Sequence, residues 1–259
     1  MSFRSAAASS VAVAVAVALA SEATAGVLYS NNFDAQALGQ INGQSAGVPG
    51  FPLIAWAANG DASVINGSTG PQPFSGRSLL MRATAAANTN RSTSFLAETP
   101  WLSRPSGEDT VACSIVMRVG AGQENQTASF GCNAVAAGGG AGLGFRVSAA
   151  DGSISVISGE TLTATGASVT LGAWNSFTIY WNTVTESTAL LVNGNVVFSG
   201  LSAVTGDFRR FTMVANSGTA GGGGAAMFDN YSISSIPTPG AAIAMLIGIP
   251  AAAGRRRSR

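Results

Sequence analysis

Short apolar or alternating runs, separated by glycine, asparagine, aspartate, serine and proline, fill the chain from residue 26 to residue 235. The run TVACSIVMRV at 110–119 has the period of two that is typical of a strand with one buried face. No stretch of this region keeps a helical period, and no internal repeat appears. The pattern predicts one all-β domain with antiparallel strands at 78–83, 92–97, 110–119, 127–132, 143–149, 153–158, 174–181, 188–192, 195–199, 209–216 and 226–234.

One hairpin can be predicted in detail. In TALLVNGNVVF, Asn193-Gly194 stands between two apolar runs, and Asn-Gly suits a type I′ turn because both residues tolerate positive φ. This turn predicts that Leu191 lies opposite Val196 and that Ala189 lies opposite Phe198.

The first 25 residues depart from the strand pattern. They carry one positive charge at Arg4, an Ala/Val run at 6–20 and the small-residue sequence Ala23-Thr24-Ala25. This is the plan of a secretory signal peptide cleaved between Ala25 and Gly26. The alternative is a membrane anchor, but the run is shorter than the roughly 18–20 residues of a span. We therefore expect a signal peptide at 1–25 and export of the remaining chain.

The two cysteines suit an exported protein, in which thiols can oxidise. Folding 110–119 back on 127–132 about Gly122-Gln123 would set Cys113 opposite Cys132 and Ile115 opposite Phe130. This register places the apolar residues on one face. It predicts a cross-strand disulfide between Cys113 and Cys132, with two free thiols as the alternative.

Charge and composition exclude several functions. Five of the 13 arginines and one of the 12 acidic residues lie in the end segments, which leaves the central region with eight against eleven, a balance of −3. Without a basic cluster, nucleic-acid binding has no electrostatic basis. The chain has no histidine and no lysine, which excludes histidine-based nucleophile systems, histidine metal sites and the lysine-containing phosphate loop.

Glycoside hydrolysis needs only two carboxylates at a set separation, so the absence of histidine and lysine does not exclude it. No strand carries two glutamates at alternate positions, and Glu108-Asp109 lie in the turn-like RPSGEDT, where we expect solvated charges. We predict no enzyme activity and no cofactor. A hydrolase that uses Glu98, Glu108 or Glu160 is an alternative.

The segment WNSFTIYWNTVTESTALLVNGNVVFSG at 174–200 resembles part of the concanavalin A-like (laminin-G-like) jelly-roll domains, and AMFDNYSIS at 226–234 is similar to their last strand. The first strand, VLYSNNFDAQ at 27–36, carries a similar Phe33-Asp34. The resemblance implies an antiparallel β-sandwich over 26–235, with the first and last strands as neighbours. Lectins, polysaccharide-binding modules and β-glucanases share this fold. The glucanase motif Glu-x-Asp-x-x-Glu is absent here, which favours binding over catalysis.

Two kinds of site follow from this resemblance. Some relatives hold a structural calcium near the terminal strands, where Asp34 and Asp229 could supply carboxylates; the plainer alternative is that each caps a strand or turn. Sugar binding usually recruits exposed aromatic side chains. Trp56 and Trp101 lie in irregular, polar-flanked segments and are the candidates, with partial burial as the alternative, whereas Trp181 alternates with core positions.

The last segment, 236–259, has three parts: Pro237-Thr238-Pro239-Gly240, a 13-residue apolar run at 241–253, and Arg255-Arg256-Arg257. A helix of that run would reach about 20 Å, short of a hydrocarbon core of about 30 Å. The order resembles the PEP-CTERM class of bacterial sorting signals, in a Pro-Thr-Pro variant. The resemblance implies transient membrane insertion, processing by an exosortase-like enzyme after signal peptidase has acted, and delivery to the cell surface or extracellular matrix.

The sequence thus predicts an exported, non-catalytic protein that binds or organises extracellular polysaccharide. A purely structural matrix protein without a discrete ligand is the alternative, and a glucanase-like enzyme is a second one.

Overall fold

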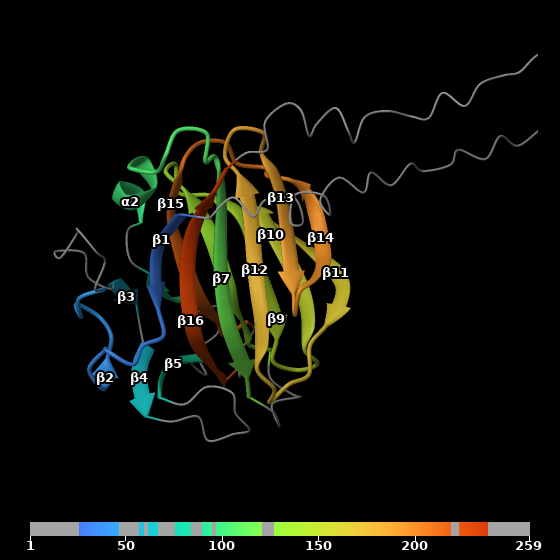
Figure 1. Cartoon of the computed structure of the whole chain (residues 1–259). Coiled ribbons are helices and arrows are strands. Elements are labelled where there is room, and N and C mark those ends of the chain that lie inside the picture. The colour runs from blue at the N-terminus through green and yellow to red at the C-terminus, as the bar shows by residue number, and fades with distance from the viewer. Residues whose placement is uncertain are drawn as a thin grey trace, which may run out of the picture.

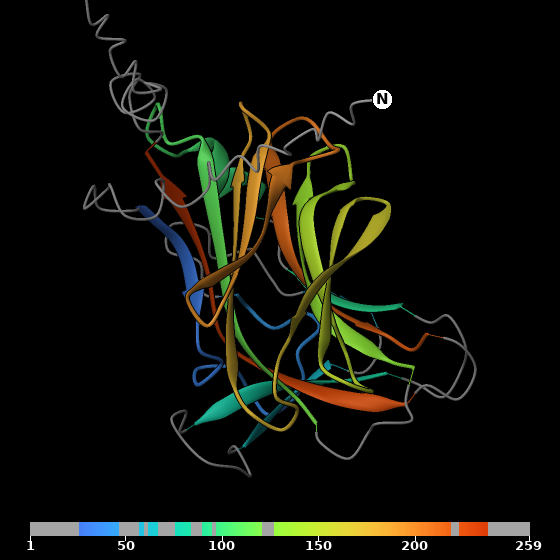
Figure 2. The same cartoon turned by 90° about the vertical axis from the view of Figure 1, so that its right-hand side faces the viewer.

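The computed structural model describes residues 26–46, 57–59, 62–66, 76–83, 90–94, 97–120, 127–218 and 223–237, with only the backbone described at 57–59 and 90–94. These residues form two antiparallel sheets that lie face to face (Figure 1). Figure 2 shows the two layers from the side on which β11 and β14 form their edges. The described part of the chain is a two-layer β-sandwich.

The larger sheet has nine strands, in the order β14 (Asn195–Leu201), β13 (Ser187–Val192), β12 (Asn175–Asn182), β7 (Thr110–Val119), β16 (Gly224–Ile236), β5 (Arg77–Ala83), β4 (Ala62–Asn66) and β2 (Gly39–Gln40), with β1 (Gly26–Asn31) paired to β16. The smaller sheet has seven strands, in the order β11 (Thr161–Ser168), β10 (Ser153–Gly159), β9 (Ala141–Ser148), β8 (Ser129–Ala136), β15 (Phe208–Asn216), β6 (Asn90–Ser94) and β3 (Ala57–Asn59).

One hydrophobic core fills the space between the sheets. Alternate residues of the central strands point into it, as the period of two predicts, so that Cys113, Ile115 and Met117 of β7 are all buried there. Across the interface, the rings of Phe145 and Phe177 stack with centroids 4.5 Å apart. This core fixes which side chains each sheet presents to the outside.

The strand predictions are confirmed for most of the chain, but the alternation rule missed four strands, β2, β3, β4 and β11, and a helix; β2 and β3 have only two and three residues. β11 is exposed along most of its length, so its sequence TLTATGAS carries no apolar period. β4 has only five residues, too few to establish a period. The short helix α2 (Glu98–Leu102) was not expected; it buries Pro100 and Trp101.

The Asn193-Gly194 hairpin is confirmed at its turn. Asn193 and Gly194 have φ of 50° and 80°, and Leu191 pairs with Val196. The next predicted pair is wrong: an irregularity between Leu190 and Leu191 shifts the register, and Phe198 lies opposite Leu190. Turn residues specify the first pairs of a hairpin, and a bulge further along changes the rest.

The predicted hairpin between 110–119 and 127–132 is wrong. β7 pairs with β12 and β16 in the nine-stranded sheet, whereas β8 pairs with β9 and β15 in the other. Both strands do bury one face, so the apolar pattern was correct. The pattern could not tell pairing within a sheet from packing across two sheets.

The first and last strands are neighbours, as the resemblance implied: β1 pairs with β16, with Gly26 opposite Ser235. The predicted signal peptide at 1–25 and the sorting segment from Thr238 onward lie outside the described residues. Pro237 directly follows β16. None of the helices within the described ranges is long and apolar enough to cross a membrane.

Candidate binding site at the terminal strands

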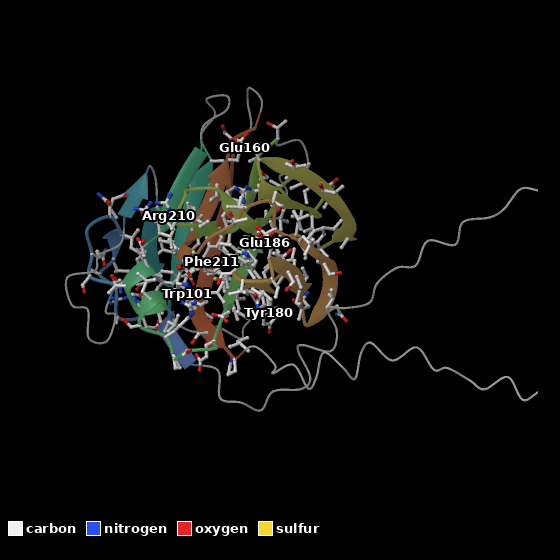
Figure 3. The ribbon with its side chains drawn as sticks, turned by 90° about the horizontal axis from the view of Figure 1, so that it is seen from above. Trp101, Glu160, Tyr180, Glu186, Arg210 and Phe211 are labelled. Atoms are coloured by element: carbon white, nitrogen blue, oxygen red, sulfur yellow. The ribbon has the colours of Figure 1, made fainter. Side chains whose placement is uncertain are left out.

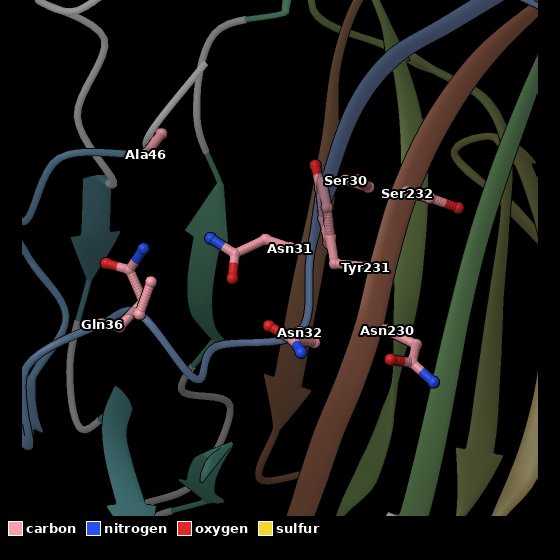
Figure 4. A pocket seen from close by; sticks show the side chains of 9 residues that line it. Ser30, Asn31, Asn32, Gln36, Ala46, Asn230, Tyr231 and Ser232 are labelled. Atoms are coloured by element: carbon pink, nitrogen blue, oxygen red, sulfur yellow. The ribbon is translucent and has the colours of Figure 1, made fainter. Parts of the chain in front are cut away.

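A polar hollow of about 580 Å³ lies where β1 and β16 run side by side (Figure 4). Most of its lining side chains are amides or hydroxyls. We call it the amide hollow and define it by Ser30, Asn31, Asn32, Ala35, Gln36, Ala46, Asn230, Tyr231 and Ser232.

The backbone around the amide hollow departs from regular strand geometry. β16 has a register shift between Asp229 and Ser232, and Asn230 within it has a φ of 49°. On the other side, Phe33 turns the chain after β1 with a φ of 62°, held by its N–H, which donates to Asn31 Oδ1 at 2.6 Å. Asparagine tolerates such a φ, which is consistent with Asn230 at the shift in β16, whereas a bulky residue such as Phe33 adopts it rarely.

The amides of the hollow fall into two groups. Those of Asn31 and Asn32 are held by local hydrogen bonds, from Asn31 Nδ2 to Tyr29 Oη at 2.6 Å and from Asn32 Nδ2 to Asp34 Oδ2 at 2.8 Å. The side chains of Gln36 and Asn230 form no hydrogen bond with another described residue. Because an amide both donates and accepts, these two groups can bind a ligand hydroxyl in either direction.

Asp34 and Asp229, the predicted calcium ligands, lie next to the hollow. Asp34 is exposed, and its Oδ1 accepts from the Arg77 backbone N–H at 2.7 Å. Asp229 is only 4% exposed. Burial raises the pKa of Asp229 to about 6, the Asn230 backbone N–H opposes the rise, and the charge of Asp34 adds to it. The structure thus brings the two carboxylates into electrostatic contact.

These two carboxylates fit a hard cation in charge and donor type. Calcium prefers carboxylate and carbonyl oxygens, and a cation would offset both the burial that chiefly raises the pKa of Asp229 and the smaller effect of the Asp34 charge. However, calcium takes about six to eight oxygens, and the described residues contain no group of three or more His, Cys, Asp or Glu side chains that could hold a metal. The remaining ligands would be carbonyl oxygens or water.

Trp101 is not the exposed platform that its sequence context suggested. It is 0% exposed, and its Nε1–H donates to Asp207 Oδ1 at 3.2 Å. Its ring meets that of Phe208 edge-on at 5.7 Å, and the Arg104 guanidinium lies 3.9 Å from the ring centroid. Trp101 therefore anchors α2 to the sandwich. Trp56 lies outside the described residues.

The glutamates considered for hydrolysis have separate surroundings. Glu98 Oε2 lies 3.5 Å from Arg209 Nε, and Glu160 is exposed at the turn between β10 and β11 (Figure 3). Glu108 was expected to be solvated, which is wrong: it is 9% exposed, and its carboxylate accepts a hydrogen bond from Ser235 Oγ on β16. Turn-like sequence did not reveal that the last strand passes over this loop.

Cys113 and Cys132 are free, fully buried thiols in this structure. Burial raises the pKa of both, and for Cys113 the nearby charge of Cys132 adds to the rise. The two residues come from facing sheets and not from neighbouring strands of one hairpin. Their oxidation to a disulfide stays a prediction.

Sequence reasoning identified Asp34 and Asp229 but missed the amides beside them. A signal was present, since Asn32-Phe33-Asp34 and Phe228-Asp229-Asn230 combine the same three residue types. These segments lie near opposite ends of the chain, so only the pairing of β1 with β16 shows that their amides share one hollow.

No family model matches the chain, and no curated protein matches it. Among solved structures, it is similar to a sialidase, with a TM-score of 0.50 and 11% identity over 70% of this chain and 17% of that one. It is also similar to the receptor-binding domain of botulinum neurotoxin C/D mosaic serotype, with a TM-score of 0.52 and 11% identity over 86% of this chain and 51% of that one.

A third similar structure belongs to botulinum neurotoxin type C, whose cell entry depends upon interaction with two ganglioside molecules; its TM-score is 0.50, at 10% identity over 82% of this chain and 50% of that one. The chain spans about half or less of these proteins' lengths. At such identities the likeness concerns the fold alone. The chain shares the β-sandwich architecture of these jelly-roll structures.

Proposed function

We propose that this protein is an exported, non-catalytic β-sandwich that binds extracellular polysaccharide at the amide hollow. The observation that carries the proposal is the hollow itself. Its volume of about 580 Å³ falls in the range of small-molecule sites, about 300–1,000 Å³. Its amides and hydroxyls match the hydroxyl-rich surface of a neutral sugar, in which each group both donates and accepts.

Two further observations support a binding role. Within the described ranges the three candidate glutamates have separate surroundings, and that of Glu108 is a buried hydrogen bond to the last strand. The similar botulinum neurotoxin type C interacts with gangliosides, which are glycolipids. Glycan binding by a protein of similar fold supports a glycan-binding role for this chain.

The export part of the proposal rests on the two end segments. The signal-peptide pattern at 1–25 would direct secretion, with cleavage after Ala25 by signal peptidase. The tail at 236–259 would insert transiently in the membrane, with Arg255-Arg256-Arg257 on the cytoplasmic side, until an exosortase-like enzyme processes it. The protein would then bind the polysaccharide at the cell surface or in the extracellular matrix.

Binding to a panel of neutral and acidic polysaccharides tests this function. We expect saturable binding to a neutral polymer, weakened about tenfold by Gln36→Met and by Asn230→Gly, since each variant removes one hydrogen-bonding amide. Methionine keeps the side-chain volume of Gln36, and glycine keeps the positive φ at residue 230. Asn195→Gly, on the exposed edge strand β14, is the matched control.

Two results would contradict the proposal in different ways. If no polysaccharide binds the wild-type protein, the binding function is wrong, and the structural matrix alternative takes its place. If a polysaccharide binds and both hollow variants keep wild-type affinity, the function stands but the site is wrong.

A further inference from the structure

Two arginines on the outer face of the seven-stranded sheet have no acidic partner. Arg146 belongs to β9 and Arg210 to β15, and neither forms a salt bridge within the described part of the chain. Other arginines of this region do have one: Arg104 lies 3.2 Å from Asp109, and Arg209 lies 3.5 Å from Glu98. The central region has a net charge of −3, so it has more acidic residues than arginines that could pair with them.

Strand alternation places these side chains outside the core. Phe145 and Val147 are core residues, so Arg146 between them points outward. Phe211 and Met213 are likewise core residues, so Arg210 and Thr212 point outward. In the view from above, Phe211 lies between Arg210 and Tyr180 of the other sheet (Figure 3).

Backbone pairing gathers four polar residues on this face. Thr212 lies directly opposite Asn133 of β8, and Asn133 lies opposite Gly144 of β9, two residues before Arg146. Arg210 precedes Thr212 by two residues and so shares its face. We call Asn133, Arg146, Arg210 and Thr212 the arginine face.

Gly144 has no side chain and so leaves room for a polar side chain on the arginine face. A Cβ at Gly144 would stand 2.1 Å from Asn133 Oδ1, so the Asn133 amide lies over the bare backbone of the neighbouring strand. Arg146 Nη1 donates to the same Oδ1 at 2.9 Å and to the Phe145 carbonyl at 2.7 Å. These bonds hold the guanidinium against the sheet, and its burial lowers the pKa of Arg146 to about 10, so it remains charged at neutral pH.

Two further polar groups on the arginine face have no hydrogen-bond partner among the described residues. Thr212 is 6% exposed, and its Oγ1 has no partner; Arg210 Nε is also buried without one. Nearly all buried polar groups in proteins are hydrogen-bonded, so two orphans on one face call for an explanation. The described residues therefore leave part of the hydrogen-bonding capacity of this face unsatisfied.

We propose that the arginine face binds carboxylate groups of an acidic polysaccharide, at a site separate from the amide hollow. Guanidinium groups bind carboxylates through paired, charge-assisted hydrogen bonds. A uronic-acid polymer carries one planar carboxylate on each sugar, a group that matches the planar fork of a guanidinium. This proposal rests on the proposed function only in taking the ligand to be a polysaccharide.

Affinity electrophoresis of the exported domain, residues 26–237 and so with all the described strands, in gels containing polygalacturonate tests the proposal. We expect retardation of the wild-type protein that weakens as salt rises, and a loss of about tenfold in affinity for Arg146→Gln and for Arg210→Gln. Arg82→Gln, an exposed arginine on β5 of the other sheet, removes the same charge and should change affinity less than twofold. Arg210 Nε has no hydrogen-bond partner among the described residues, so its variant keeps the test valid even if Arg146→Gln lowers stability.

The outcomes separate this site from the amide hollow. Loss of polygalacturonate binding in both arginine variants, with Gln36→Met unaffected, supports the proposal. Equal binding by Arg210→Gln and wild type overturns it, as does wild-type binding to a neutral polymer but not to polygalacturonate, which leaves the proposed function intact. Retardation by polyphosphate or dextran sulfate without retardation by polygalacturonate overturns the assignment to carboxylates.

Discussion

Asp229 shows how one residue can combine burial with negative charge. Its ordinary pKa of 3.8 rises to about 6 because the fold buries it, and the charge of Asp34 adds to the effect. The folded state therefore holds a proton that the unfolded state has already lost between about pH 4 and pH 6. The contribution of Asp229 to stability is therefore greatest below this window, falls as the pH rises through it, and stays lower above it.

Replacing Asp229 with asparagine tests whether the buried charge of this residue lowers stability. The amide oxygen of the new side chain can still accept from the Asn230 N–H, but the side chain carries no charge. We expect Asp229→Asn to raise the melting temperature at pH 7.5 by about 3 °C or more, and to change it little at pH 4. Thermal unfolding of both proteins across this range is the measurement, and an equal effect at both pH values would contradict the electrostatic explanation.

Calcium should offset the same destabilising charge in the wild-type protein. If Asp34 and Asp229 share a cation, about 1 mM CaCl₂ raises the melting temperature at pH 7.5, because binding to the folded state alone stabilises it. Asp229→Asn should abolish the calcium-dependent rise. A melting temperature that is insensitive to calcium would leave the two aspartates with capping roles only.

At the scale of the element, local features were predictable and partner choice was not. Asn193-Gly194 fixes its own turn through its φ preferences, so the hairpin could be read from adjacent residues. β7 and β8 carry correct core faces, yet which sheet each joins depends on β12, β15 and β16, far along the chain. The amide hollow was missed for the same reason.

Tight packing across the sheets gives a prediction for β9. A Cβ at Gly142 would stand 2.6 Å from the Trp181 ring of the facing sheet, and both groups are fully buried. We expect Gly142→Ala to cost about 1–3 kcal/mol of unfolding free energy by overpacking. Denaturant unfolding measures this cost. Gly138→Ala has open space around its Cβ and should stay within about 0.5 kcal/mol of wild type, so similar costs for both would refute the packing argument.

For the whole molecule, export and processing can be measured together as one mass. We expect protein isolated from its native envelope without reduction to have the mass of a chain from Gly26 to about Pro237-Thr238-Pro239. A further loss of two hydrogens would show that Cys113 and Cys132 have oxidised. A mass that extends through Arg259 would contradict tail processing, and one that begins at Met1 would contradict export.

The pairing of Gly26 with Ser235 gives the chain the connectivity of a nearly closed ring. Cα atoms of paired antiparallel residues are about 5 Å apart, so a linker of a few residues could join them. The ring could then be cut elsewhere, for example at the exposed turn around Gly138 and Gly139, and every strand would keep its neighbours. The same closeness places both ends of the described sandwich, Gly26 and Ile236, at one pole of the domain.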